Sequence, residues 1–133
     1  MTRVLVVEDD PSVGPAIRMV LDGEGYDTVL VADADSGMRA FEALHFDLAI
    51  VDIFMPETSG LVTIAGFRRR SPSVPIIAIS GFRFRDSMNP GLDFLGLAAA
   101  AGAAVCLRKP FARRQLMTAV RASIDASVPA FIS

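Results

Sequence analysis

Residues 47–60 read DLAIVDIFMPETSG, and this stretch ends an apolar run on a carboxylate. The four residues before Asp52 are Leu, Ala, Ile and Val, a continuous run that is typical of a strand covered on both faces. An unpaired carboxylate beside a hydrophobic core is costly and tends to take up a proton. We therefore expect a cation or a basic side chain to hold Asp52 in its ionised form.

Four other apolar runs have the same character: VLVV at 4–7, TVLVA at 28–32, VPIIAIS at 74–80 and AAVCL at 103–107. Segments with helical spacing of apolar residues lie between and after these runs, at 13–21, 36–44, 60–70, 92–101 and 112–127. Asp10 is placed to cap the first of these helices, and Gly23 and Gly25 are expected to end it. The alternation predicts an α/β domain with one parallel sheet and helices on both faces.

The composition limits the class of protein. A chain of 133 residues, 52% of them hydrophobic and 21% charged, matches one globular domain with a real core. The net charge of −2 gives no electrostatic case for nucleic acid, so we expect no direct DNA binding. The single cysteine fits a reducing compartment, and the apolar runs are too short for a signal peptide or a membrane span. These features predict a soluble cytoplasmic protein.

Residues that directly follow the predicted strands carry the chemistry, because ligands of open α/β sheets bind beyond the carboxyl ends of the strands. Glu8 and Asp9 follow the first run, and Asp52, Ser80 and Lys109 follow or end the third, fourth and fifth. If the first and third strands are neighbours, the three acids share one pocket and repel one another. Mg²⁺, a hard cation that prefers oxygen ligands, would relieve this repulsion together with the lysine.

Four motifs in this order carry a family resemblance: VLVVEDD at 4–10, VDIFMPETSG at 51–60, AISG at 78–81 and GAAVCLRKPF at 102–111. Together they resemble the receiver domain of bacterial two-component response regulators, of the stand-alone kind. The resemblance implies a doubly wound, flavodoxin-like (βα)₅ fold with strand order 2-1-3-4-5. It also implies a receiver domain over residues 1–127, followed by a short tail, 128–133, and no output domain.

The resemblance also implies the roles of the site residues. Asp52 would accept a phosphoryl group from a phosphohistidine on a sensor histidine kinase or a histidine phosphotransfer protein. Asp9 would bind Mg²⁺ directly and Glu8 through water, and the main-chain carbonyl of Phe54 would be a further ligand. Lys109 would contact a phosphoryl oxygen. This chemistry needs positioning and charge stabilisation more than a covalent helper.

Ser80 would be the switch hydroxyl that moves toward the phosphate, and Gly81 would leave room for the phosphoryl group. The peptide bond between Lys109 and Pro110 is expected to be cis. The domain would then act as a phosphorylation-controlled switch that signals by binding an unidentified protein or by passing its phosphoryl group onward. It would catalyse only its own phosphorylation and dephosphorylation, with no enzymatic activity on outside substrates.

Three features depart from the family pattern. Cys106 stands where an aromatic residue is common, and it is interpreted as a small buried residue, with redox sensing as the alternative. Phe54 is bulky, which suggests the hypothesis that it hinders water attacking the acyl phosphate. The segment 81–96 is long for its place, and its Phe82–Arg85 stretch either presents a partner surface or packs against the sheet edge.

Two other functions are compatible with the fold. A pseudo-receiver would bind partners without being phosphorylated, but the chain has the full set of acids, serine and lysine. A phosphatase with an aspartyl nucleophile would usually carry a second aspartate two residues after the first, where this chain has Phe54. We therefore expect a working receiver domain.

Overall fold

The structure is a computed structural model that describes residues 2–55, 59–81 and 94–126. Strands and helices alternate along the chain, as the sequence predicts: β1 (Arg3–Val7), α1 (Val13–Gly23), β2 (Asp27–Val31), α2 (Ala34–Ala43), β3 (Leu48–Asp52), α3 (Gly60–Arg70), β4 (Ile76–Ser80), α4 (Phe94–Ala101), β5 (Val105–Arg108) and α5 (Arg113–Ala126). Within the described part of the chain, every helix is too short or too polar to cross a membrane.

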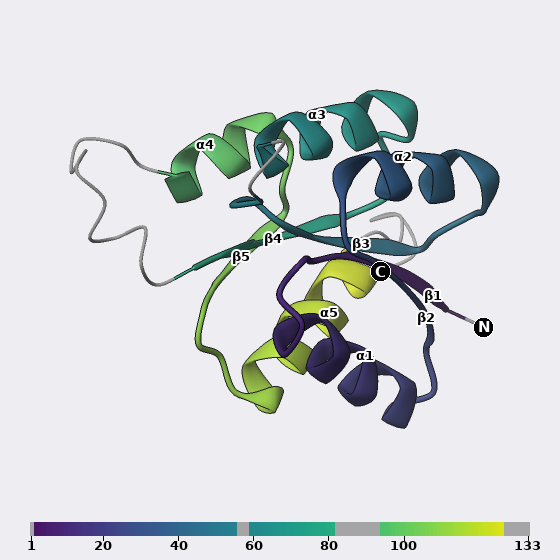
Figure 1. The fold of residues 1–133 in the computed structure, drawn as a ribbon, viewed down its shortest axis with the longest axis vertical. Coiled ribbons are helices and arrows are strands. Elements are labelled where there is room, and N and C mark those ends of the chain that lie inside the picture. Colours follow the sequence, from purple (N-terminus) through teal and green to yellow (C-terminus); the bar gives the residue numbers. More distant parts are fainter. Residues whose placement is uncertain (1, 56–58, 82–93, 127–133) are drawn as a thin grey trace.

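The five strands form one parallel sheet in the order β2-β1-β3-β4-β5 (Figure 1). The predicted order 2-1-3-4-5 is therefore confirmed. From β1 the chain first turns outward to β2 and then returns to the other side to form β3, so the direction of winding reverses between β1 and β3. Such a reversal opens a crevice at the carboxyl ends of the two strands. The crevice is where the acidic residues are expected.

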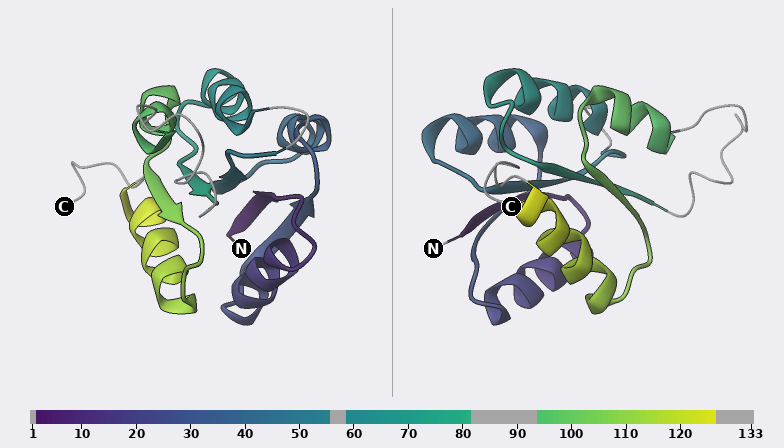
Figure 2. Two further views of the ribbon diagram at one scale, coloured as in Figure 1. Left: turned by 60° about the vertical axis from the view of Figure 1, so that its left-hand side comes forward. Right: turned by 180° about the vertical axis from the view of Figure 1, so that it is seen from behind.

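Helices cover both faces of the sheet. α1 and α5 lie on one face, and α2, α3 and α4 lie on the other (Figure 2). The core under α1 and α5 is built mainly from aliphatic side chains such as Ile17, Leu21 and Val120. The core under α2, α3 and α4 contains the aromatic rings of Phe41 and Phe67, which stack with their centroids 4.2 Å apart. The second core is called the α2–α4 core below.

Some element ends differ from the sequence prediction by one or two residues. α2 begins at Ala34 rather than Ser36, because the Asp33 side chain accepts a hydrogen bond from the Ser36 N–H at 2.7 Å and caps the helix earlier. β4 begins at Ile76 rather than Val74, and Pro75 just before it has no N–H to donate to a ladder. Residues 92 and 93 of the predicted fourth helix lie outside the described residues.

Candidate functional site

Three acidic residues meet at the carboxyl edge of the sheet. β1 pairs with β3, and Val7 lies opposite Val51. The next residues along each strand, Glu8 and Asp52, are therefore brought together. Glu8 and Asp52 are each only 3% exposed, whereas Asp9 is exposed. One carboxylate oxygen of each of the three lies within 4.8 Å of the others. The structure thus brings together the acids that the sequence placed in one pocket.

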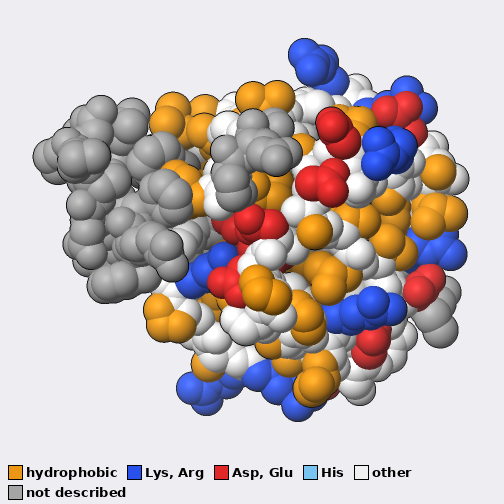
Figure 3. All heavy atoms as spheres, viewed as in Figure 1, with side chains coloured by type: hydrophobic (Ala, Val, Ile, Leu, Met, Phe, Trp, Pro, Cys, Tyr) orange, Lys and Arg blue, Asp and Glu red, His pale blue; other side chains and the backbone are white. Residues whose placement is uncertain are grey.

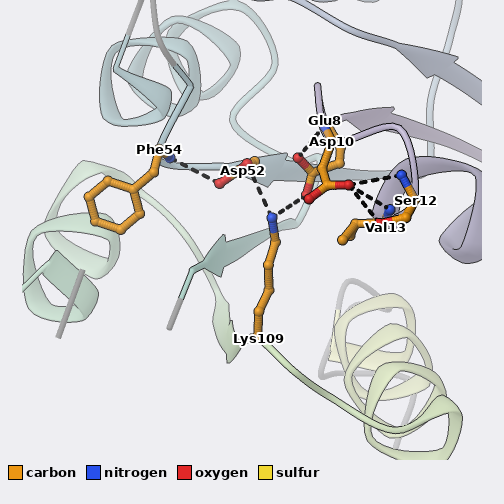
Figure 4. A network of polar contacts seen from close by, with 7 residues as sticks. All are labelled: Glu8, Asp10, Ser12, Val13, Asp52, Phe54 and Lys109. Atoms are coloured by element: carbon orange, nitrogen blue, oxygen red, sulfur yellow. Dashed lines mark hydrogen bonds and ion pairs between the residues drawn. The ribbon is translucent and has the colours of Figure 1, made fainter. Parts of the chain in front are cut away.

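Lys109 reaches this cluster from the end of β5. Its Nζ atom lies 2.6 Å from Oε1 of Glu8 and 3.4 Å from Oδ2 of Asp52 (Figure 4). The sequence predicted that this lysine offsets the charge of Asp52, but its shorter contact is with Glu8. The sequence does not reveal that Lys109 lies closer to Glu8, because this distance depends on the conformations of the two side chains beyond the ends of their strands. Lys109 therefore bridges two buried carboxylates.

Main-chain N–H groups hold the outer oxygens of the same two carboxylates. The Phe54 N–H donates to Oδ1 of Asp52 at 3.0 Å, and the Asp10 N–H donates to Oε2 of Glu8 at 3.2 Å (Figure 4). The sequence suggests a metal-binding carbonyl and a shielding ring for Phe54, but it gives no signal for this N–H group. Since each carboxylate is held from two sides, both are fixed in orientation.

Asp10 belongs to the first helix rather than to the cluster. Its Oδ1 accepts hydrogen bonds from the N–H of Ser12 at 2.8 Å and of Val13 at 3.3 Å, as expected of a capping residue. The hydrogen bonds from Ser12 and Val13 lower the pKa of Asp10. The charge of Asp10 is thus used at the start of α1.

The buried acids and the lysine shift one another's protonation. Burial, together with a hydrogen bond and charge repulsion from Asp52, raises the pKa of Glu8 from 4.5 to about 7, and Lys109 only partly opposes this. Burial alone would lower the pKa of Lys109, but the hydrogen bond to Glu8 and the charges of both acids raise it above its ordinary value. Lys109 is therefore charged at neutral pH, and one lysine faces more negative charge than it can offset.

Ser80 ends β4 at the same edge and is buried. Ile79, the residue before it, pairs with Asp52, and the main-chain carbonyl of Ser80 accepts a hydrogen bond from the Lys109 N–H at 2.8 Å. The peptide bond between Lys109 and Pro110 is cis, as the resemblance implied. Ser80 therefore lies between the strand of the acid and the strand of the lysine.

Helix α3 begins directly against the main chain of Asp52. The Gly60 N–H donates to the Ile53 carbonyl at 3.1 Å, and a Cβ atom at Gly60 would lie 2.2 Å from the Asp52 carbonyl oxygen. Such a distance is impossible for a real side chain, and the obstacle is main chain that cannot rotate away. The glycine at the end of the stretch quoted at the outset is thus required by this contact.

The Phe54 side chain does not extend toward the carboxylate. Its ring points away from Asp52 (Figure 4), and it is half-buried against the α2–α4 core. The hypothesis that the ring shields the acid from water therefore finds no support in this position. Cys106, the other departure from the family pattern, packs against the same core as its interpretation predicts, but it is half-buried rather than buried. Residues 82–93, which include the Phe82–Arg85 stretch, lie outside the described residues.

The donor set fits a hard divalent cation. All the side-chain ligands within reach are carboxylate oxygens, which Mg²⁺ and Ca²⁺ prefer to softer nitrogen or sulfur ligands. Burial is the largest cause of the raised pKa of Glu8, and repulsion from Asp52 adds to it; a bound cation would oppose both effects by favouring the charged carboxylate. In the view of Figure 3, acidic side chains gather near the middle of the visible face, with Lys or Arg side chains beside them.

Comparison with known proteins gives the family. A family model described as the response regulator receiver domain matches residues 4–121. The chain belongs to the response regulator receiver domain family. Receiver domains are signalling modules of two-component systems, so the chain is such a module, and the resemblance of its motifs to receiver domains is confirmed.

Similar receiver domains come from longer proteins and from solved structures. The DNA-binding response regulator MtrA of Mycolicibacterium smegmatis is 31% identical over 122 residues, which cover 92% of this chain and 50% of that protein. The sensory transduction protein RegX3 of the same organism is 34% identical with the same coverage. The chain thus spans about half the length of these curated relatives.

Two solved structures are similar over nearly the whole chain. A receiver domain protein (CheY-like) from Methanospirillum hungatei has a TM-score of 0.84 and 25% identity, with 96% of each chain covered. The chemotaxis protein CheY4 of Vibrio cholerae has a TM-score of 0.80 and 25% identity, covering 92% of this chain and 98% of that one. The receiver fold is therefore shared along the whole described domain.

Proposed function

We propose that this receiver domain accepts a phosphoryl group on Asp52 from a phosphohistidine of a sensor histidine kinase or a histidine phosphotransfer protein. One observation carries the proposal: Asp52 is buried at the end of β3, yet a lysine and two further acids surround its carboxylate. A structural aspartate would need neither the acids nor the lysine. A nucleophile that accepts a phosphoryl group needs a positively charged side chain and a binding site for a metal ion, because both offset the negative charge of the phosphoryl oxygens.

In the transfer, an Asp52 carboxylate oxygen forms a bond to phosphorus, and the bond from phosphorus to the histidine nitrogen breaks. The electron pair of the broken bond stays on the histidine, which leaves as a neutral imidazole once protonated. Lys109, 3.4 Å from Oδ2, is placed to offset the charge of a phosphoryl oxygen. Its contact with Glu8 keeps the ammonium group at the site before transfer.

We propose that Mg²⁺ binds among the acids, held directly by Asp9 and Asp52, through water by Glu8, and by the main-chain carbonyl of Phe54. When bound, the ion supplies positive charge that neutralises the incoming phosphoryl oxygens. The Glu8 side chain would then give up its proton. The fit rests on the three carboxylate oxygens that lie within 4.8 Å of one another.

Ser80 is proposed as the hydroxyl that turns toward the phosphoryl group, with Gly81 leaving room beside it. We further propose that the receiver domain covers residues 1–127, and that it signals by protein binding or onward phosphotransfer. Direct DNA binding is not proposed, although relatives such as MtrA are named as DNA-binding. The net charge is −2, and basic side chains are spread around the visible face rather than gathered (Figure 3).

Beryllofluoride, which mimics a phosphoryl group on aspartate, provides the test. Amide NMR spectra are recorded during titration with Mg²⁺ and then beryllofluoride, in the wild type and in Asp52→Ala. We expect saturable shifts at Asp52, Ser80 and Lys109 in the wild type and none from beryllofluoride in the variant. A wild type without any beryllofluoride response would instead indicate a pseudo-receiver that binds its partners without phosphorylation.

A further inference from the structure

We propose that Phe54 couples the state of Asp52 to the core beneath α4. Its main chain responds to the charge on the aspartate, and its ring carries the displacement into the α2–α4 core. The inference rests on the proposed function, because it needs Asp52 to be the residue that is modified. It assigns the Phe54 side chain a positioning role that its place in the sequence does not reveal.

The main chain of Phe54 is tied to the carboxylate. Its N–H donates to Oδ1 of Asp52 at 3.0 Å, and this bond to a charged oxygen is of the stronger kind. When either oxygen of Asp52 becomes bonded to phosphorus, the carboxylate charge is no longer shared over both oxygens. The negative charge on Oδ1 falls in either case, so the bond from Phe54 weakens. The carboxylate therefore holds the peptide before Phe54 less tightly when Asp52 is modified.

The ring of Phe54 lies in a different environment from its main chain. It points away from the carboxylate (Figure 4) and packs, half-buried, against the α2–α4 core. An isolated bridge between Phe54 and Ser59 joins the two ends of the loop that leads into α3. A shift of the Phe54 main chain therefore moves a large ring against a packed core, and packed cores respond by rearranging.

Two of the side chains that β4 and β5 contribute to this core, Ala78 and Cys106, are small, whereas Ile76 at the start of β4 is bulky. Ala78 of β4 lies opposite Cys106 of β5, and both belong to the α2–α4 core together with Ala98 of α4. The stacked rings of Phe41 and Phe67 belong to α2 and α3 instead. Small side chains leave α4 without a bulky neighbour from β4 or β5 at these positions. Phe54 is the residue that both donates a main-chain hydrogen bond to Asp52 and packs an aromatic ring against this core.

The test measures how far the response to beryllofluoride spreads. Amide shifts are recorded at saturating Mg²⁺ and beryllofluoride, so that a change in affinity does not enter. The quantity compared is the ratio of the shifts at Ala98–Ala101 and Cys106 to the shifts at Asp52 and Lys109. We expect this ratio to fall at least threefold in Phe54→Ala, to fall less in Phe54→Leu, and to be restored in Phe54→Tyr.

Leu61→Ala is the matched control. Leu61 is also half-buried against the α2–α4 core, but its N–H donates to the Ser59 hydroxyl oxygen and not to the carboxylate. Truncating it loosens the same core without cutting the link to Asp52, so we expect the wild-type ratio. An unchanged ratio in Phe54→Ala and Phe54→Leu, or an equal loss in Leu61→Ala, would overturn the coupling role. A wild type without a beryllofluoride response would overturn the proposed function first.

Discussion

β3 and β5 both end at the site, but the two strands are packed differently. Every residue of β3 is buried, including Asp52 itself, whereas β5 is half-buried as far as Leu107 and exposed at Arg108. β1, which leads to Glu8 and Asp9, is buried from Val4 onward and so resembles β3. The acids are therefore held by rigid strands, and the lysine is held by a strand that can adjust.

The position of each strand in the sheet explains the difference. β3 lies between β1 and β4, and helices cover both of its faces, while β5 is an edge strand with one neighbour. Close packing fixes a side chain in one rotamer, and lighter packing leaves room for movement at low cost. A switch needs both: a fixed nucleophile and a neighbouring region that can respond to its modification.

The largest effect is expected from Phe67→Ala in the α2–α4 core. The ring is fully buried and stacks on Phe41 at 4.2 Å, so its loss should lower the free energy of unfolding by about 3–5 kcal/mol. Cys106→Ala removes one half-buried sulfur from β5 and should cost about 1 kcal/mol or less. Urea denaturation measures both, and equal costs would mean that the ring of Phe67 stabilises the α2–α4 core no more than the sulfur of Cys106 does.

Gly60→Ala tests the main-chain contact that fixes Asp52. The added Cβ meets the Asp52 carbonyl oxygen, so α3 or the end of β3 must move, at a cost of about 1–3 kcal/mol or more. Gly23→Ala is the matched control at the end of α1, where a Cβ has nothing within 4 Å and alanine favours the helix. Thermal unfolding of the two variants gives the comparison. A Gly60→Ala protein as stable as the wild type would show that the strand end is not rigid.

The raised pKa of Glu8 predicts an unusual pH dependence. The folded protein keeps a proton on Glu8 between pH 4.5 and about 7, where the unfolded chain has lost it. Without metal, stability should therefore decrease as the pH rises through this window, on the order of 2–3 kcal/mol at most. Glu8→Gln should remove this contribution. Stability measured by urea denaturation at pH 5 and pH 7.5 checks the direction, and added Mg²⁺ should restore stability at the higher pH.

The smallest effect is expected at Glu24, which follows α1 and contacts two arginines of α5. Its Oε2 lies 2.9 Å from Arg113 and its Oε1 lies 2.8 Å from Arg121. Arg113 is the first residue of α5, shortly after Lys109, so this contact fixes the chain beyond the lysine. Because both arginines are largely exposed, Glu24→Gln should cost less than about 1 kcal/mol, and less still at high salt. A loss of several kcal/mol would mean that the lysine side is as rigidly anchored as the acid side.

Much of the fold follows from local patterns in the sequence. Continuous apolar runs predict buried parallel strands, and the alternation with helices predicts the sheet, because these patterns record which faces of each element are covered. The strand order came from the family resemblance. Element ends were less accurate where a single side chain decides them, as at Asp33, whose cap to Ser36 starts α2 early.

The candidate site was predicted as a set of residues but not as a network. The residues that follow strands could be named, since the topology brings those positions together. The preference of Lys109 for Glu8, the N–H bond of Phe54 to Asp52, and the direction of the Phe54 ring could not be named. They depend on rotamers and loop conformations that only the packed structure defines.

The hydrogen bond from the Lys109 N–H to the Ser80 carbonyl has a practical consequence. This amide proton links Lys109 to Ser80, the proposed switch residue. It can exchange with deuterium only when the ends of β4 and β5 separate. The exchange rate at Lys109 therefore serves as a built-in reporter on the coupling of β4 and β5. It can be followed in the unlabelled protein by mass spectrometry, with no probe attached near the site.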